Sequence, residues 1–163
     1  MFQPNEYVVY GRTGVCLVEG IERFGGRDYY TLHSLYQKCR IQTPVNGKIP
    51  MRRLITKDQA DALIDSIPSM HVKPVNSRTQ QELNEEYRKY VLSQDCRDLI
   101  LLTMSIYAKK MELQKAKKKL AGADDAYFKE GESLLFGELS IVLGIPITEV
   151  QNYIKARINT NKS

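Results

Sequence analysis

The feature that most constrains the fold of this chain is a change of hydrophobic pattern near residue 56. Before that point the apolar residues stand in short β-branched and aromatic runs such as Tyr7–Tyr10, which favour strands. Beyond it they recur every three or four residues, as in Ile100, Met104 and Tyr107, which is the period of an amphipathic helix. The sequence therefore predicts an α+β protein, with a β part followed by an all-α part.

Turn signals divide the β part into short strands. The dipeptide Gly25-Gly26 supplies the positive φ angles of a tight turn, Asn46-Gly47 is a turn signal that closes a strand, and Gly11 to Gly14 are expected to form a further turn. Strands are expected at residues 7–10, 15–21, 29–36, 39–45 and 51–55. Short strands at this spacing predict a small β-barrel or sandwich.

The helical part is expected to begin directly after the last strand. Thr56 and Gln59 fit a capping box for a short helix that Pro68 ends. We therefore expect a barrel with a short closing helix at residues 1–67, a proline-containing linker at 68–77, and a four-helix domain at 78–163.

Within that four-helix domain, single residues mark the expected helix ends. Asp95 is a predicted N-cap, while Gly122 and Gly144 are predicted to end helices. Thr148 with Gln151 predicts a capping box for the last helix. The polar tail from residue 159 is expected to fray.

The basic residues are distributed unevenly. Residues 97–119 hold seven Lys/Arg against two acidic residues, a net charge of +5 that equals the net charge of the whole chain. Such a segment is consistent with a polyanionic partner. For Lys115–Lys119 alone, a solvated helix end is an equally simple interpretation, because lysines stabilise a helix C-terminus.

Residues that could carry catalysis are sparse. The chain has no nucleophile-elbow, phosphate-loop or zinc-protease motif. His33 and His71 lack neighbours at metal-ligand spacing, and Cys16, Cys39 and Cys96 are expected to be buried thiols. We expect a protein that is not an enzyme and uses no cofactor or metal. No apolar run is long enough for a membrane span and no secretory signal is visible, which predicts a cytoplasmic location without membrane attachment.

A strand edge is the most promising binding feature. Arg40, Ile41, Gln42 and Thr43 precede Pro44, and a proline within a strand indicates the edge of a sheet. An exposed edge can accept a partner strand through main-chain hydrogen bonds. The alternative is that Pro44 merely protects the edge from pairing.

Several segments together resemble the CarD/CdnL family of bacterial transcription regulators. In the β part the family has an initial aromatic residue, a VVY run with a following turn, a V-x-x-IE strand, a strand ending in VP and an L-R-x-L-I segment. The matching segments are Phe2, Tyr7–Gly11, Gly14–Glu22, Tyr29–Leu32, Ile41–Val45 and Met51–Ile55. In the helical part Gly137-Glu138-Leu139 resembles the family's GEL-type segment.

The resemblance implies a Tudor- or SH3-like RNA polymerase-interacting domain, related to a module of transcription-repair coupling factors. In the family this domain pairs a strand with the β subunit of the polymerase. Carried over, the contact falls on the segment Arg40, Ile41, Gln42 and Thr43, with Phe24 at the neighbouring turn. The family often has arginines at the positions of Phe24 and Gln42.

The resemblance also implies that the helical domain meets promoter DNA at the upstream edge of the bubble and modulates open-complex stability. Some members insert a tryptophan there, which would fall among Ser77–Gln80, whereas this chain has no tryptophan. An apolar wedge helps to hold unstacked bases apart. The predicted phosphate contacts are Arg78, Arg88, Lys89, Lys109, Lys110 and Lys129. Such contacts give weak, sequence-independent binding that salt weakens.

Two other functions stay open at this stage. The first is an adaptor that binds polymerase without touching DNA, since the wedge tryptophan is missing. The second is a stand-alone nucleic-acid-binding protein in which Tyr29, Tyr30 and Tyr36 stack on bases, although core packing is the more common role of such residues. We expect a monomer in the absence of partners.

Overall fold

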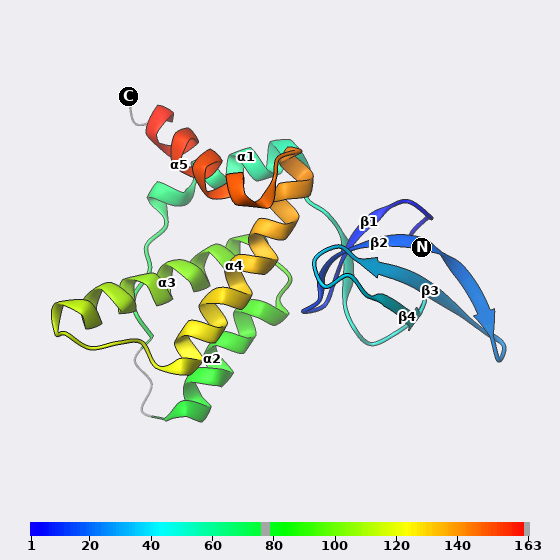
Figure 1. Ribbon diagram of the computed structural model, residues 1–163, viewed down its shortest axis with the longest axis horizontal. Coiled ribbons are helices and arrows are strands. Elements are labelled where there is room, and N and C mark those ends of the chain that lie inside the picture. Colours follow the sequence, from blue (N-terminus) through cyan, green and yellow to red (C-terminus); the bar gives the residue numbers. More distant parts are fainter. Residues whose placement is uncertain (76–78, 162–163) are drawn as a thin grey trace. The chain divides into compact units, whose positions relative to one another are not determined.

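The computed structural model describes residues 1–75 and 79–161. The chain divides into two compact units, a β unit at Met1–Thr56 and a helical unit at Lys57–Ser163. All strands lie in the first unit and all helices in the second (Figure 1). The predicted α+β class with an N-terminal β part is therefore confirmed.

The β unit is one antiparallel sheet with the strand order β4-β3-β2-β1-β5. The five predicted strands are all present, although β2 is longer than expected. In the described part of the chain β4 and β5 do not pair, so the sheet is open and small rather than a closed barrel. The strands are β1 Tyr7–Tyr10, β2 Gly14–Phe24, β3 Arg27–Ser34, β4 Arg40–Pro44 and β5 Met51–Arg53.

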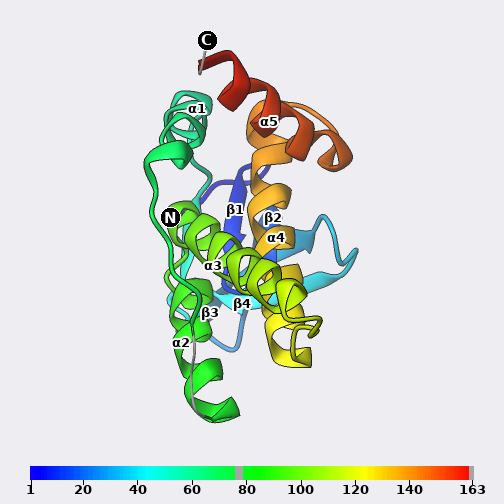
Figure 2. The same ribbon diagram turned by 90° about the vertical axis from the view of Figure 1, so that its left-hand side faces the viewer.

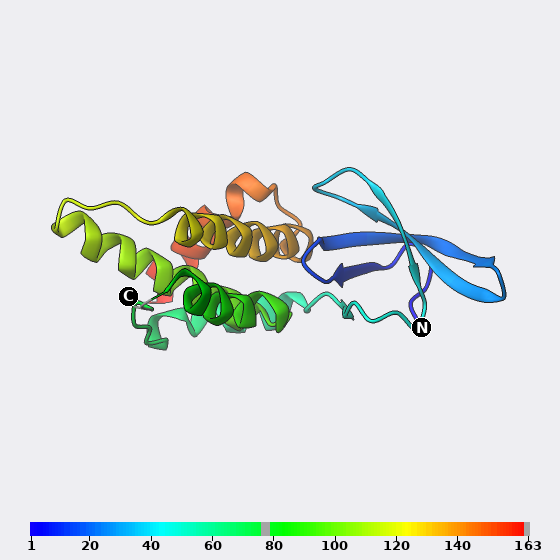
Figure 3. The same cartoon turned by 90° about the horizontal axis from the view of Figure 1, so that it is seen from below.

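The two longest strands, β2 and β3, form a hairpin whose tip extends beyond β1 (Figure 3). Gly25 and Gly26 make the predicted tight turn, with φ angles of 55° and 80° that glycine adopts without steric cost. A bulge between Val18 and Gly20 interrupts the register, which increases the local twist of the strand. The buried core consists of Val8, Tyr10, Cys16, Val18, Tyr30 and Leu32.

The helical unit contains the four predicted helices of residues 78–163 and the short helix that precedes them. Its core combines Leu83, Tyr87 and Val91 of α2 with Leu102 and Ile106 of α3. The α3 face predicted from the spacing of Ile100, Met104 and Tyr107 is only partly correct, because Ile100 is buried but Tyr107 is 54% exposed. The helices are α1 Lys57–Asp65, α2 Gln80–Leu92, α3 Cys96–Lys115, α4 Gly122–Leu143 and α5 Val150–Asn161, with short 3₁₀ turns η1 Ile67–Ser69 and η2 Ile147–Glu149.

The short helix α1 belongs to the helical unit, whereas the sequence had suggested grouping it with the barrel in residues 1–67. The reason is a set of polar contacts with α5, which lies beside it in Figure 2. Arg157 donates from Nε and Nη2 to the two carboxylate oxygens of Asp65, at 2.7 and 3.0 Å. Tyr153 Oη donates to Asp61 at 2.7 Å. The hydrogen bond from Arg157 lowers the pKa of Asp65, so this carboxylate stays ionised at neutral pH.

The predicted helix ends are mostly correct. Asp95 caps α3 by accepting from the Arg97 N–H at 2.9 Å, and Gly144 ends α4 in the left-handed conformation with φ of 69°. The prediction for Gly122 is wrong, because it is the first residue of α4 rather than the end of α3. Thr79, which the sequence analysis overlooked, caps α2 by accepting from the Glu82 N–H at 3.1 Å.

The C-terminal residues also differ from the expectation of a frayed tail. Helix α5 continues to Asn161, whose side chain donates to Asp65 at 2.6 Å. Its start lies at Val150, after the 3₁₀ turn that contains Thr148. The contact with α1 therefore holds the last described turn of this helix in place.

Gly131 sets the distance between α3 and α4, which run side by side (Figures 1 and 2). A Cβ atom at this position would lie 3.2 Å from Leu102 Cδ2 and 3.2 Å from Thr103 Cγ2. Both contacts are tighter than normal van der Waals distances, and the neighbours are themselves packed in a buried interface.

We expect Gly131→Val to lower the free energy of unfolding by about 1–3 kcal/mol, because the added methyl groups force the two helices apart. The measurement is urea denaturation followed by circular dichroism at 222 nm. The matched control is Gly122→Val, since no atom lies within 4 Å of a Cβ at Gly122. Because valine has a higher helix propensity than glycine, a loss of stability for Gly131→Val no larger than that for Gly122→Val would contradict packing as its cause.

Among the described residues no single helix is long and apolar enough to cross a membrane. One pair of segments, Gly122–Leu143 with Ile147–Asn161, meets the length and composition criteria only jointly and across a bend of 102°.

Candidate functional site

The outer edge of β4 offers main-chain groups for pairing, which confirms the edge position predicted from Pro44. Ser34 N–H donates to the Cys39 carbonyl at 2.8 Å, and Val45 N–H donates to the Asp28 carbonyl at 2.9 Å. Residue pairs in an antiparallel ladder alternate between hydrogen-bonded and non-hydrogen-bonded types. These two bonds therefore fix, for each β4 residue between them, whether its main-chain N–H and carbonyl groups point toward β3 or away from it. Ile41 and Thr43 direct their main-chain groups to β3, and Arg40, Gln42 and Pro44 direct theirs outward.

The outward edge therefore presents the N–H and carbonyl groups of Arg40 and Gln42, whereas the Pro44 carbonyl accepts from the Gly47 N–H at 3.0 Å. Pro44 lacks an N–H, and its main-chain position faces away from β3, where the missing donor costs the sheet nothing. It limits the pairing segment at its C-terminal end without closing the edge. An extended partner strand could add to this edge by main-chain hydrogen bonds alone.

The side chains of the predicted docking residues point to both faces of the sheet. Thr43 is buried and accepts a hydrogen bond from Tyr10 Oη at 3.2 Å. Ile41 packs against the core of the β unit. Gln42 is exposed, and Arg40 is exposed and lies 3.4 Å from the Glu19 carboxylate at the β2 bulge. A partner can therefore reach the side chains of Arg40 and Gln42 but only the backbone of Thr43.

Phe24 lies at the tip of the β2–β3 hairpin and not next to these residues in the ladder, since β4 pairs with Tyr29 to His33 of β3. Its ring packs edge-on against Tyr29, with centroids 6.1 Å apart, and half of the side chain is exposed. Tyr30, by contrast, is in the core, so of the tyrosines considered for base stacking one is excluded by burial.

The predicted DNA-contacting residues fall on three helices. Arg78 lies outside the described residues, and so does half of the segment Ser77–Gln80 where the wedge tryptophan was expected. Arg88 and Lys89 are exposed on α2, where Lys89 pairs with Glu86 at 3.5 Å. Lys110 and Lys129 border the same surface hollow, and Lys129 pairs with Asp125 at 2.9 Å.

Lys109 differs from the other candidates because it forms a largely buried ion pair. Its ammonium group lies 3.1 Å from Asp124 Oδ1, and its side chain is 16% exposed while that of Asp124 is 1% exposed. The same carboxylate oxygen accepts from Tyr87 Oη at 2.7 Å. Burial and this carboxylate raise the pKa of Tyr87, so its hydroxyl stays protonated. Lys109 thus joins α3 to α4 and has its charge compensated inside the unit.

The sequence interpretation missed this triad because it treated Asp124 as a helix-start residue. A signal was present: Lys109 continues the spacing of Leu102 and Ile106, and Asp124 continues that of Phe128 and Leu135, so both polar residues lie on buried faces. A second buried carboxylate, Glu138, accepts a hydrogen bond from Cys96 Sγ at 3.1 Å.

The cysteines are free thiols, but they are not all buried as expected. Cys16 and Cys96 are buried, and burial raises the pKa of Cys16 to about 11. Cys39 is exposed at the end of the β3–β4 connection. Within the described ranges no three His, Cys, Asp or Glu side chains are grouped as metal ligands would be.

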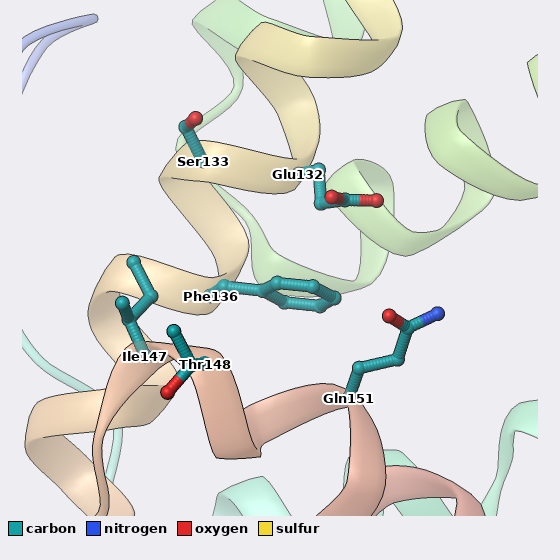
Figure 4. Close-up of a pocket in the computed structure, with 6 residues that line it drawn as sticks. All are labelled: Glu132, Ser133, Phe136, Ile147, Thr148 and Gln151. Carbon is teal, nitrogen blue, oxygen red and sulfur yellow. The ribbon is translucent and has the colours of Figure 1, made fainter.

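Two adjoining surface hollows lie between the helices of the helical unit. The smaller, of about 290 Å³, is formed by α4, η2 and α5, and in Figure 4 the Phe136 ring lies between Glu132 and Gln151. The larger, of about 590 Å³, adds residues of α3 such as Met104 and Tyr107. Glu132 is the one carboxylate among the described residues that line either hollow, so neither brings two acidic side chains together.

Comparison with known proteins finds a family match for the β unit. Residues 2–55 match the family model described as the CarD-like/TRCF RID domain, the type of RNA polymerase-interacting domain that the sequence resemblance implied. The match ends where the β unit ends and includes every strand. No curated protein matches the chain.

Proposed function

We propose that this chain is a non-catalytic regulator of bacterial transcription initiation. In this proposal the outer edge of β4 pairs with a strand of the RNA polymerase β subunit, and the helical unit contacts promoter DNA near the upstream edge of the bubble. The protein then changes the lifetime of the open complex and works in the cytoplasm as a monomer until it binds polymerase.

The observation that carries the proposal is the coincidence of the matched domain with an open edge. Residues 2–55 match an RNA polymerase-interacting domain, and β4 within that range directs the main-chain groups of Arg40 and Gln42 outward. The charge of the β unit also favours an acidic partner. The β unit carries eight basic and four acidic side chains, a net charge of +4.

The experiment is co-purification of the full chain with bacterial core RNA polymerase, followed by competition with an isolated fragment of the β subunit lobe. We expect a stoichiometric complex, and we expect the fragment to displace the polymerase from it by competition. Absence of a complex would contradict the proposal. A complex that persists in the presence of the fragment would indicate that the contact lies on another subunit. Open-complex lifetime on one promoter, with and without the protein, then measures the regulatory effect.

An adaptor that never touches DNA is the second candidate, and the charge of α2 favours it. This helix carries the predicted contacts Arg88 and Lys89 but also Glu82, Glu85 and Glu86, which gives a net charge of −1. A net negative helix is a poor partner for phosphates. Charge reversal of Arg88 and Lys89 discriminates: if polymerase binding persists and open-complex lifetime is unchanged, DNA is contacted elsewhere or not at all.

A further inference from the structure

We infer that the phosphate-contacting element of the helical unit is the lysine turn at the C-terminal end of α3, defined as Lys115, Lys117, Lys118 and Lys119, rather than α2. The inference rests on the proposed function, which includes DNA contact by this unit. The partner is the phosphate backbone of duplex DNA. The turn connects α3 to α4 and is drawn in yellow-green at the end of α3 in Figure 1.

The charge of the helical unit is concentrated at this turn. Residues 57–163 carry sixteen basic and fifteen acidic side chains, a net charge of only +1. Without the four lysines of the turn the unit would have a net charge of −3. The unit therefore attracts a polyanion at this end, because in the rest of the unit the acidic side chains outnumber the basic ones.

The lysines of the turn are exposed and uncompensated. All four are exposed, and in the part of the chain that the structure describes none takes part in an ion pair or a side-chain hydrogen bond. Lys89, Lys109 and Lys129 among the predicted contacts each have a carboxylate partner within 3.5 Å. Phosphates can bind the turn without first breaking an ion pair.

The backbone holds the turn in a defined shape. Lys117 N–H donates to the Gln114 carbonyl at 3.0 Å and Lys118 N–H to the Leu113 carbonyl at 2.7 Å, which closes the end of α3. On the other side Leu120 packs against the core of the helical unit. The lysines are thus presented on a turn fixed at both ends, so a ligand need not order a free tail.

The conformation of Lys117 supports a role beyond stability. Its φ angle is 58°, in the left-handed region where helices usually end with glycine. A lysine here carries the steric strain of its Cβ atom. The attraction of lysine for the helix C-terminus explains Lys115, which lies in the last turn. It does not account for three further lysines beyond the helix, whose charges repel one another.

The test is the salt dependence of duplex DNA binding by the full chain, measured by fluorescence anisotropy with a labelled duplex. Lys118→Gln/Lys119→Gln is compared with Arg88→Gln/Lys89→Gln, because each variant removes two exposed positive charges. For the lysine-turn variant we expect the slope of log affinity against log salt to become shallower by about 1.8. At 0.1 M salt its affinity should fall on the order of 60-fold.

The Arg88/Lys89 variant is expected to keep the slope of the natural chain. If instead it loses affinity and the lysine-turn variant does not, the inference is overturned while DNA contact stands. If the natural chain binds no duplex but still co-purifies with polymerase, the DNA part of the proposed function fails together with the inference. If the lysine-turn variant loses polymerase binding with unchanged DNA affinity, the turn binds an acidic protein surface and the inference is wrong. Far-UV circular dichroism verifies that both variants fold.

Discussion

Replacing Asp124 by alanine is expected to lower the free energy of unfolding of the helical unit by about 3 kcal/mol. The carboxylate is 1% exposed and lies 3.1 Å from the Lys109 ammonium group. Its removal leaves that ammonium group without a counter-ion in a mostly buried position. It also removes the acceptor of the Tyr87 hydroxyl, and an unpaired buried polar group destabilises the fold further.

The neighbouring carboxylate provides the matched control. Asp125 pairs with Lys129 at 2.9 Å, but both side chains are at least half exposed, so Asp125→Ala should cost less than about 1 kcal/mol. Urea denaturation followed by circular dichroism at 222 nm reports on the helical unit, because every described helix lies in it. If Asp124→Ala lowers the free energy of unfolding as little as the control does, the ion pair between Lys109 and Asp124 is solvated.

Double substitution separates the ion pair from the surrounding packing. If Asp124→Ala destabilises the unit by leaving Lys109 uncompensated, adding Lys109→Met should restore part of the lost stability, since an apolar side chain of similar length fills the same space. A double variant no more stable than Asp124→Ala alone would assign the loss to the Tyr87 hydrogen bond. The comparison is a double-mutant cycle read as free energies of unfolding.

The β unit could be predicted well because its information is local. Gly25-Gly26 and the glycines of the turn after Tyr7–Tyr10 each fix a strand end through positive φ angles that few other residues allow, and Asn46-Gly47 marks the turn after β4. The expected strands are therefore present, and the edge position of Pro44 followed from its missing N–H. Closure into a barrel was not predictable in this way, because it depends on which partner β5 selects, and the observed partner is β1, which is distant in sequence.

The helical unit was predicted less completely, because tertiary contacts decide its details. The grouping of α1 with α5 depends on Asp65 and Arg157, which are 92 residues apart. No local pattern relates these positions. The role of Lys109 likewise depends on Asp124 in another helix, so a surface interpretation based on charge alone placed a buried lysine among the DNA contacts.

Thr79 is a different case, because its signal is local. With Glu82 three residues later it fits the capping box that was recognised at Thr56 and Thr148. The helical domain was expected from residue 78, but no cap was assigned to its first helix. The prediction of DNA contacts likewise overlooked neighbouring residues. It considered the positive charge of Arg88 and Lys89 without the carboxylates that α2 places beside them.

Replacing Gln42 by proline is expected to weaken binding to RNA polymerase at least about tenfold, which corresponds to about 1.4 kcal/mol. The Gln42 N–H is one of two donors on the outward edge of β4, as the hydrogen bonds of Cys39 and Val45 with β3 require. Proline removes this donor and leaves an acceptor of the incoming strand unpaired in the interface. It removes no hydrogen bond between β3 and β4, so the sheet should fold.

The control for this experiment is Gln42→Ala, which shortens the side chain but keeps the N–H group. If main-chain pairing is the docking mode, alanine should bind within about twofold of the natural chain, since few interface side chains contribute strongly. The measurement is the dissociation constant for core polymerase, with the thermal unfolding midpoint of each variant as a check on folding. Equal weakening by alanine and proline would place the recognition in the side chain. Binding unaffected by proline would move the docking surface away from β4, and the exposed hairpin tip at Phe24 is then the next surface to test.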